Sequence, residues 1–324
     1  MRAPIATGRR PFIGRLLGTI LLPISLACGD TTPVPPTSPG APDQPTPPTT
    51  VPQTPAAPEQ ATPPSHWELS GDLYLADSSG AVLRLLTQGG WPLWSPDGRR
   101  IVFHRDGVVR VIDADGANEL ALGAGQWPAW SPDGGRIAFA KPDGIYVMNV
   151  DGTAAKVLMS PDLYRLRDWD DIAMLAWSPD GSLIAYQQVN WERPDKIFVM
   201  TADGSTRRAL TSTVGNQYAE SDPAWSPDGT RIIYWSFGYG IGTIDRNGGT
   251  TGTIHLDYPN VAYLSRPTWA PDGRTITYNT WARPSSIITM SPSAREPRVL
   301  IQDGFNAAWS PDGRRLAFVR LRAP

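Results

Sequence analysis

Residues 128–139 read PAWSPDGGRIAF, and the pentad inside this stretch, Trp-[Ser or Ala]-Pro-Asp-Gly, occurs six times in the chain. The repeated tryptophans are Trp94, Trp130, Trp177, Trp225, Trp269 and Trp309. Consecutive copies lie 36 to 48 residues apart, which is the period of one four-stranded blade of a β-propeller. The repeat therefore predicts an all-β fold built from blades.

Each repeat contains two hairpin signals. In the second copy, residues 131–134 form a turn between two apolar stretches, because Pro132 fixes φ and Gly134 tolerates a positive φ. A second pair of apolar stretches, residues 145–149 and 155–158, is joined through the Asp-Gly step at 151–152. One repeat thus predicts one antiparallel, four-stranded blade.

The two ends of the repeat array are complementary halves. Residues 72–86 form an outer hairpin with no pentad before it, and the last pentad, at residues 309–313, has no outer hairpin after it. Together they make one blade. We therefore expect a six-bladed propeller whose ring closes by pairing N-terminal with C-terminal strands, which removes exposed sheet edges.

The segment before the repeats has the layout of an export signal and a tether. Residues 1–27 are basic, then apolar, as in a signal peptide. Cys28, the one cysteine, ends a stretch that resembles a lipobox, although Ser25 stands where leucine is usual. Residues 8–13 resemble a twin-arginine signal. The alternative is an ordinary secretory peptide with an incidental cysteine.

The next segment, residues 28–66, is rich in Pro and Thr and contains thirteen prolines between Pro33 and Pro64. Because proline removes backbone donors and favours extended chain, this composition predicts a semi-rigid tether. Glycosylation and docking of proline-binding domains are the alternatives. Residues 67–324 are then expected to form the propeller.

The charge pattern argues against nucleic acid as a partner. The chain has 29 Lys and Arg against 31 Asp and Glu, a net charge of −2. Four of the arginines lie in the predicted signal peptide, so the remainder carries about −6. Phosphate binding needs a cationic surface, and the body has lysine only at positions 141, 156 and 196.

The repeat resembles the TolB-like, or PD40 (WD40-like), β-propeller family, whose repeat reads much like PAWSPDGxRIAF followed by IYVMNxDG. The resemblance covers about residues 70–320 and implies the propeller fold. TolB itself has an α/β domain before its propeller, where this chain has only the proline-rich segment. The same repeat occurs in the propellers of prolyl oligopeptidase-like peptidases and oligogalacturonate lyases. A peptidase of that kind needs a Gly-x-Ser-x-Gly motif, which the chain lacks.

We expect function where the repeats differ. The repeated tryptophans are expected to pack between sheets, and the Asp-Gly steps near residues 113–116 to be turns, since calcium loops need more oxygen ligands. Long connections rich in aromatic and charged residues gather on the face opposite the pentad turns. The predicted ligand-binding residues are Arg165, Asp168, Trp169, Trp191, Arg193, Tyr218, Glu220, Trp235, Tyr239, Tyr263, Arg266, Trp281 and Arg283.

These features favour a non-catalytic, monomeric binding scaffold in the periplasm or at the cell surface. It would touch the membrane only through a lipid on Cys28 and recognise a protein or peptide partner through the loop-rich face, without a metal or cofactor. One alternative is a polysaccharide-acting lyase, hydrolase or lactonase that uses His104, a metal and loop carboxylates. These are Asp168, Asp170, Asp171, Glu192 and Glu220. Another is an envelope factor that engages a Pal-like lipoprotein at the channel mouth, as the family resemblance implies.

Overall fold

The structure is a computed structural model of the whole chain. It describes residues 71–160, 170–190, 194–211, 219–237, 239–249, 251–254, 264–280, 284–293 and 296–321. The chain divides into two compact units, Met1–Trp67 and Glu68–Pro324, and all described residues lie in the second. Cys28 and the predicted signal peptide and tether fall outside the described residues. Within the described ranges, no helix has the length and apolar character needed to cross a membrane.

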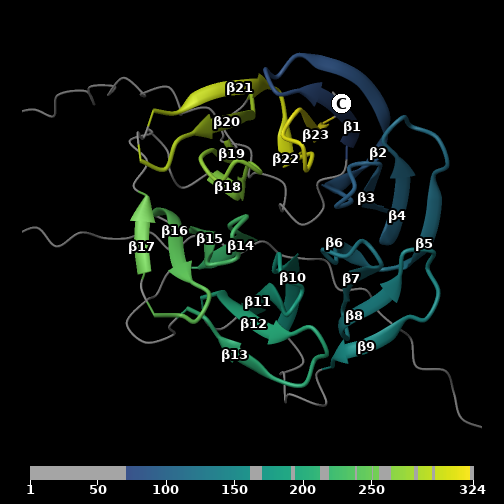
Figure 1. Cartoon of the computed structure of the whole chain (residues 1–324), viewed down its shortest axis with the longest axis vertical. Helices are drawn as coiled ribbons and strands as arrows, with labels where there is room; N and C mark the ends of the chain where they lie inside the picture. The colour runs from purple at the N-terminus through teal and green to yellow at the C-terminus, as the bar shows by residue number, and fades with distance from the viewer. Residues whose placement is uncertain are drawn as a thin grey trace, which may run out of the picture. The chain divides into compact units, whose positions relative to one another are not determined.

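Four sheets have four antiparallel strands each. They are β6 (Gln126–Trp130), β7 (Arg136–Lys141), β8 (Gly144–Asn149) and β9 (Lys156–Met159); β10 (Asp170–Trp177), β11 (Leu183–Asn190), β12 (Lys196–Thr201) and β13 (Arg207–Ala209); β14 (Glu220–Trp225), β15 (Arg231–Ser236), β16 (Gly240–Asp245) and β17 (Thr251–Ile254); and β18 (Leu264–Trp269), β19 (Ile276–Thr280), β20 (Ser286–Met290) and β21 (Arg298–Gln302). In each sheet the strand that ends at a repeated tryptophan lies innermost (Figure 1).

The fifth sheet has seven strands, in the order β22-β23-β1-β2-β3-β4-β5. Their bounds are β22 (Phe305–Trp309), β23 (Arg315–Arg320), β1 (Gly71–Asp77), β2 (Val82–Trp94), β3 (Arg100–Arg105), β4 (Val108–Asp113) and β5 (Leu120–Ala124). The long strand β2 contributes to two blades, because it pairs with β1 up to Gly89 and with β3 from Gly90 onward. Divided there, the described strands group into six four-stranded units. We number these blades 1 to 6 from the unit β2–β5.

The sheets surround a central axis, and blade 6 joins the two ends of the repeat array (Figure 1). Strand β1 pairs with β23 in continuous antiparallel register, from Asp72 opposite Arg320 to Asp77 opposite Arg315. The prediction that N-terminal and C-terminal strands pair is therefore confirmed. The fold is an all-β propeller, as the repeat predicts.

The pentad turns are held by hydrogen bonds between residues that are close in the sequence. In blade 2 the Gly134 N–H donates to the Ser131 carbonyl at 2.9 Å, and Gly134 has φ +70°. The Gly135 N–H donates to Asp133 Oδ1 at 2.9 Å. Hydrogen bonding from Ser131 lowers the pKa of Asp133, so this carboxylate is charged at neutral pH. The turn thus depends on the Asp and Gly that all six pentads keep, and on the Ser that five of them keep.

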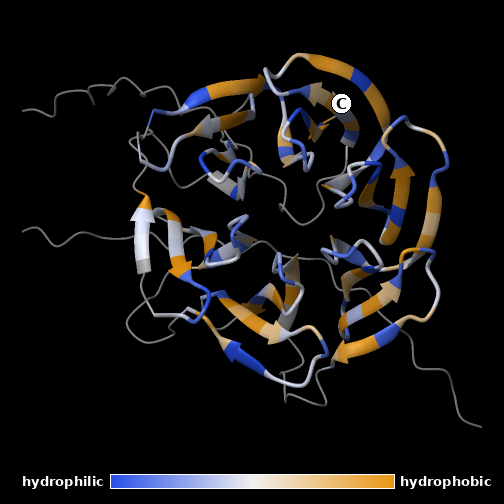
Figure 2. Ribbon diagram, in the orientation of Figure 1, coloured by the Kyte–Doolittle hydropathy of each residue, from blue (hydrophilic) through white to orange (hydrophobic). Residues whose placement is uncertain are grey.

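The core lies between neighbouring blades. Apolar residues line the strands of adjacent sheets (Figure 2), and Val102 and Val109 of blade 1 pack with Ile137 and Phe139 of blade 2. The repeated tryptophans bridge the same seams. The indole N–H of Trp94 donates to the Ala308 carbonyl of the preceding blade at 3.1 Å. Equivalent bonds run from Trp130 to Leu93 and from Trp225 to Ala176. The prediction that these residues pack between sheets is confirmed.

Candidate functional site

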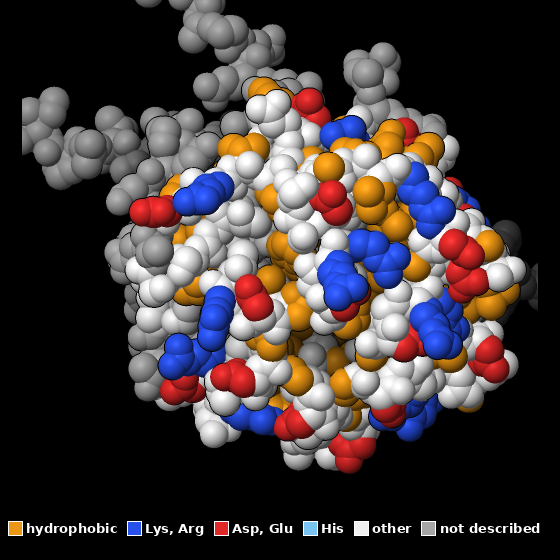
Figure 3. Space-filling model, turned by 45° about the horizontal axis from the view of Figure 1, so that its top comes forward, with side chains coloured by type: hydrophobic (Ala, Val, Ile, Leu, Met, Phe, Trp, Pro, Cys, Tyr) orange, Lys and Arg blue, Asp and Glu red, His pale blue; other side chains and the backbone are white. Residues whose placement is uncertain are grey.

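A cavity of about 300 Å³ lies where the inner strands meet. Its described lining comes from β2, β6, β10, β14 and β18, together with Pro179 in the pentad turn of blade 3. Figure 3 shows hydrophobic side chains gathered around a hollow in the middle of the face that it presents. The volume is at the lower end of ordinary ligand pockets, which span roughly 300–1,000 Å³. We call this space the axial cavity.

One position in each inner strand has an unusual backbone conformation. It lies three residues before the repeated tryptophan, and its φ is between +49° and +57° in all six blades. The six residues are Trp91, Trp127, Met174, Asp222, Arg266 and Asn306. At each of them the pairing with the neighbouring strand skips, as between Gly90 and Leu93. Positive φ is costly for bulky side chains and clusters at functional sites.

These six positions, the axial ring, differ in chemistry around the propeller. Trp91, Trp127 and Met174, from blades 1 to 3, are apolar. Asp222, Arg266 and Asn306, from blades 4 to 6, are polar. All except Asn306 line the axial cavity, which therefore has an apolar side and a polar side. The backbone repeats while the side chain changes, as expected if the ring determines what the cavity accepts.

Arg266 ties three inner strands together. Its side chain starts on β18 and is 8% exposed. One Nη donates to the Asn306 carbonyl on β22 at 3.2 Å, and the other donates to the Pro92 carbonyl on β2 at 3.1 Å. The guanidinium also lies 4.8 Å from the ring centre of Trp91. Burial lowers the pKa of Arg266 to about 10, while the charge of Asp222 opposes this shift, so Arg266 is a cation at neutral pH.

Asp222 supplies the negative charge of the axial cavity. It is 4% exposed, and its Oδ2 accepts a hydrogen bond from Ser221 Oγ at 2.7 Å. Its Oδ1 has no hydrogen-bond partner among the described residues. Because Arg266 and Asp222 both line the cavity, their charges balance there. The described lining is thus electrically neutral and mainly apolar.

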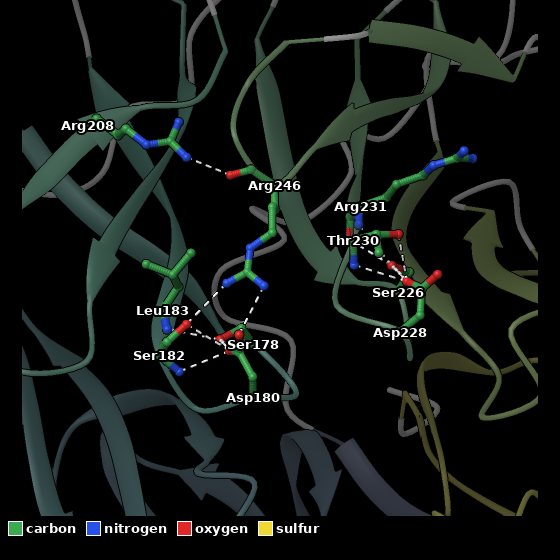
Figure 4. Close-up of polar contacts among 10 residues, drawn as sticks. All are labelled: Ser178, Asp180, Ser182, Leu183, Arg208, Ser226, Asp228, Thr230, Arg231 and Arg246. Carbon is green, nitrogen blue, oxygen red and sulfur yellow. Dashed lines mark hydrogen bonds and ion pairs between the residues drawn. The ribbon is translucent and has the colours of Figure 1, made fainter.

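The pentad turn of blade 3 forms part of the cavity rim, since Pro179 lines the cavity. Figure 4 shows Arg246 of blade 4 reaching this turn, where it donates to Asp180 Oδ2 at 3.0 Å and to Ser182 Oγ at 3.1 Å. The guanidinium of Arg246 also lies 5.7 Å from the ring centre of Trp225. Hydrogen bonding from Ser178 lowers the pKa of Asp180. These contacts hold the rim in place between blades 3 and 4.

His104, the predicted catalytic candidate of the enzyme alternative, is buried on β3. It is 4% exposed, and its Nε2 has no partner among the described residues. Burial lowers the pKa of His104 to about 4, and the charge of Arg266 adds to this shift. The imidazole is therefore neutral at neutral pH.

The depressed pKa of His104 predicts acid sensitivity. An unfolded histidine takes up a proton near pH 6.5, whereas the folded one does so near pH 4. The free energy of unfolding should therefore fall as the pH drops from about 6.5 to 4, by about 3 kcal/mol from this group. Urea titrations between pH 7 and 4.5 should show a steep dependence in the wild type and a shallower one in His104→Gln. Equal slopes would contradict the assignment.

The structure describes four of the thirteen predicted ligand-binding residues. Three of them, Glu220, Trp235 and Tyr239, lie at one end of blade 4, where Glu220 pairs with Ser236 and the Tyr239 N–H donates to the Ser236 carbonyl at 3.1 Å. Glu220 is buried and lies 3.4 Å from Lys196. Trp235 is in the core beside Ile276. Tyr239 is 45% exposed, and only Arg266 lines the axial cavity. The residues that fall outside the described ranges are Arg165, Asp168, Trp169, Trp191, Arg193, Tyr218, Tyr263, Trp281 and Arg283.

Most of the acidic residues that the enzyme alternative needs also lack a described side chain. Asp168 and Glu192 are not described, and for Asp170 and Asp171 only the backbone of β10 is. Among the described residues, no three His, Cys, Asp or Glu side chains are placed to hold a metal ion.

Sequence reasoning missed the rest of the axial ring. A signal was present, because the residue three before each repeated tryptophan varies in chemistry while the pentad that starts at the tryptophan repeats. Bulky residues at this position, such as Trp91 and Met174, do not indicate a left-handed backbone in the sequence.

Comparison with known proteins supports the fold. No protein-family model matches the chain. The putative TolB of Agrobacterium tumefaciens has a similar structure, with a TM-score of 0.65 at 21% identity over 79% of this chain and 99% of that one. TolB of Acinetobacter baumannii gives a TM-score of 0.51 at 16% identity over 76% of this chain and 63% of that one. The chain thus has a TolB-like β-propeller fold.

One curated protein is similar in sequence. It is the uncharacterized peptidase YuxL of Bacillus subtilis, 29% identical over 143 residues, or 44% of this chain. The match spans only 20% of that relative's length.

Proposed function

We propose that this protein is a non-catalytic binding scaffold that receives a segment of a protein or peptide partner in its axial cavity. The observation that carries the proposal is the axial ring, which places six side chains of five different types at one strained backbone position around the axis. Strain that recurs at a cavity is a mark of a functional site. The blades hold the ring rigidly, and rigid presentation lowers the entropy cost of binding.

The face predicted from the sequence to lie opposite the pentad turns is a second part of the proposal. The loops that carry Trp191, Trp281 and Arg283 are proposed as further contacts for the partner. Peptidase activity is not proposed, because the similarity to the Bacillus protein covers a fifth of that protein and the chain lacks Gly-x-Ser-x-Gly.

A cell-envelope location is part of the same proposal. The basic and apolar residues 1–27 followed by Cys28 support export and lipid anchoring. Labelling cells with a fatty-acid precursor should mark the wild-type protein and leave Cys28→Ser unlabelled. Equal labelling of the two proteins would remove the lipid anchor from the proposal.

Filling the axial cavity should abolish partner binding. The Met174→Trp variant is suited to this test, because Trp91 and Trp127 already occupy equivalent positions with the same backbone conformation. Peptides that bind the full wild-type chain are first selected from a random displayed library. Their affinity for the Met174→Trp variant, measured by fluorescence anisotropy, should be roughly tenfold or more lower than for the wild type.

The matched control is Val157→Thr, which changes a 45% exposed residue on the outer strand β9. This variant should bind the selected peptides like the wild type. A library that yields no binders, or binders with equal affinity for all three proteins, would exclude the axial cavity as the binding site.

A further inference from the structure

The wall of the axial cavity is dominated by tryptophan. Seven of its described lining residues are tryptophans, and the rest of these are mainly Pro, Ala and Leu. These seven are Trp91, Trp94, Trp127, Trp130, Trp177, Trp225 and Trp269. Aromatic walls favour ligands with flat or ring-shaped apolar groups, and such pockets use few polar groups to orient them.

The same wall offers a ligand few polar partners. Three of the seven indole N–H groups donate to the preceding blade. The other four have no partner among the described residues; they belong to Trp91, Trp127, Trp177 and Trp269. On the acceptor side, the unpartnered lining atoms are Asp222 Oδ1 and the hydroxyl oxygen of Thr268. All of these unpartnered atoms are fully buried behind the cavity wall, so the lining offers a ligand few hydrogen-bond acceptors. Because a buried donor without a partner is costly, a segment that lacks N–H donors loses least on entering the cavity.

The charge of the cavity further limits which ligands fit. Arg266 and Asp222 both line the cavity and balance one another. A strongly acidic segment would meet Asp222, and a strongly basic one would meet Arg266. The neutral lining therefore favours an uncharged segment.

We propose that the axial cavity binds a proline-rich segment of the partner in the polyproline II conformation. Proline has no backbone N–H, so a run of prolines offers carbonyl acceptors without donors. Polyproline II makes no internal hydrogen bonds and leaves those carbonyls free, and aromatic-lined grooves are a known way to bind it. The proposal rests on the proposed function, because it names the chemistry of the segment that enters the cavity.

The test uses the full chain and labelled synthetic peptides of equal length. An oligoproline peptide should bind the wild type, and a neutral peptide of alanine and glutamine should bind roughly tenfold or more weakly by fluorescence anisotropy. The Met174→Trp variant should lose oligoproline binding, and Val157→Thr should keep it. Trp127→Ala removes one aromatic ring from the cavity wall, so it should weaken oligoproline binding several-fold.

The chain's own prolines require a control. Oligoproline binding is also measured on a variant in which the thirteen prolines between Pro33 and Pro64 are replaced by serine, so that competition cannot hide it. Absence of binding in both proteins overturns the inference. Tightest binding of an acidic or a basic peptide, or equal affinity of the alanine–glutamine peptide, overturns it as well.

The two proposals fail in different ways. Library peptides that need the open cavity but contain no proline would uphold the proposed function and overturn the polyproline assignment. If the library yields no peptide that binds in the cavity and oligoproline does not bind either, both proposals are overturned.

Discussion

Replacing Arg266 with methionine should lower the free energy of unfolding by about 4 kcal/mol. The substitution removes both hydrogen bonds from the guanidinium, so the carbonyls of Pro92 and Asn306 lose their charged donor inside the ring. It also leaves the Asp222 carboxylate, which is 4% exposed, without its neighbouring cation. Hydrogen bonds to a charged group contribute about 1.5–3 kcal/mol each, and Arg266 makes two of them.

Urea unfolding followed by circular dichroism measures this loss, and Arg136→Met is the matched control. Arg136 also lies over a tryptophan, 5.3 Å from the ring centre of Trp177, but its side chain is 41% exposed. An exposed cation above an aromatic ring contributes about 0.5–1 kcal/mol. If Arg266→Met were no less stable than Arg136→Met, the role of Arg266 in tying blades 5, 6 and 1 would be wrong.

Arg266→Lys separates charge from geometry. Lysine keeps the positive charge beside Asp222 but cannot place two fixed donors on two carbonyls as the planar guanidinium does. Its stability should therefore fall between those of the wild type and Arg266→Met.

The propeller could be predicted because its signals are local and repeated. The pentad around Trp130 fixes one turn through Ser131, Asp133 and Gly134, and six copies leave little freedom in the overall arrangement. Even the pairing of β1 with β23 followed from counting half-blades at the two ends of the array.

The axial cavity was harder to predict, because its key features come from contacts between distant parts of the chain. The left-handed backbone at Trp91 and Met174 arises where the inner strand skips pairing with its neighbour, and no Gly or Asn marks it in the sequence. Arg266 was predicted as a binding residue, but its partners at Pro92 and Asn306 lie far along the chain.

A buried charge pair lies between blades 3 and 4. Lys196 Nζ on β12 is 3.4 Å from Glu220 Oε2 on β14, and the two side chains are 4% and 3% exposed. The backbone joins the same seam, since the Glu220 N–H donates to the Asp195 carbonyl at 3.0 Å. Burial raises the pKa of Tyr234 to about 12, and the negative charge of Glu220 adds to the shift. The seam therefore holds a carboxylate far from solvent, with Lys196 as a counter-ion.

Lys196→Met should lower the free energy of unfolding by about 3–5 kcal/mol, because it removes the counter-ion and leaves the Glu220 carboxylate in the seam. The double variant Lys196→Met/Glu220→Leu removes both charges and should lose less than the single variant, as buried ion pairs replaced by apolar side chains often do. Urea unfolding of the wild type and of both variants measures the difference. A double variant less stable than Lys196→Met would show that Glu220 stabilises the seam through contacts other than its pair with Lys196.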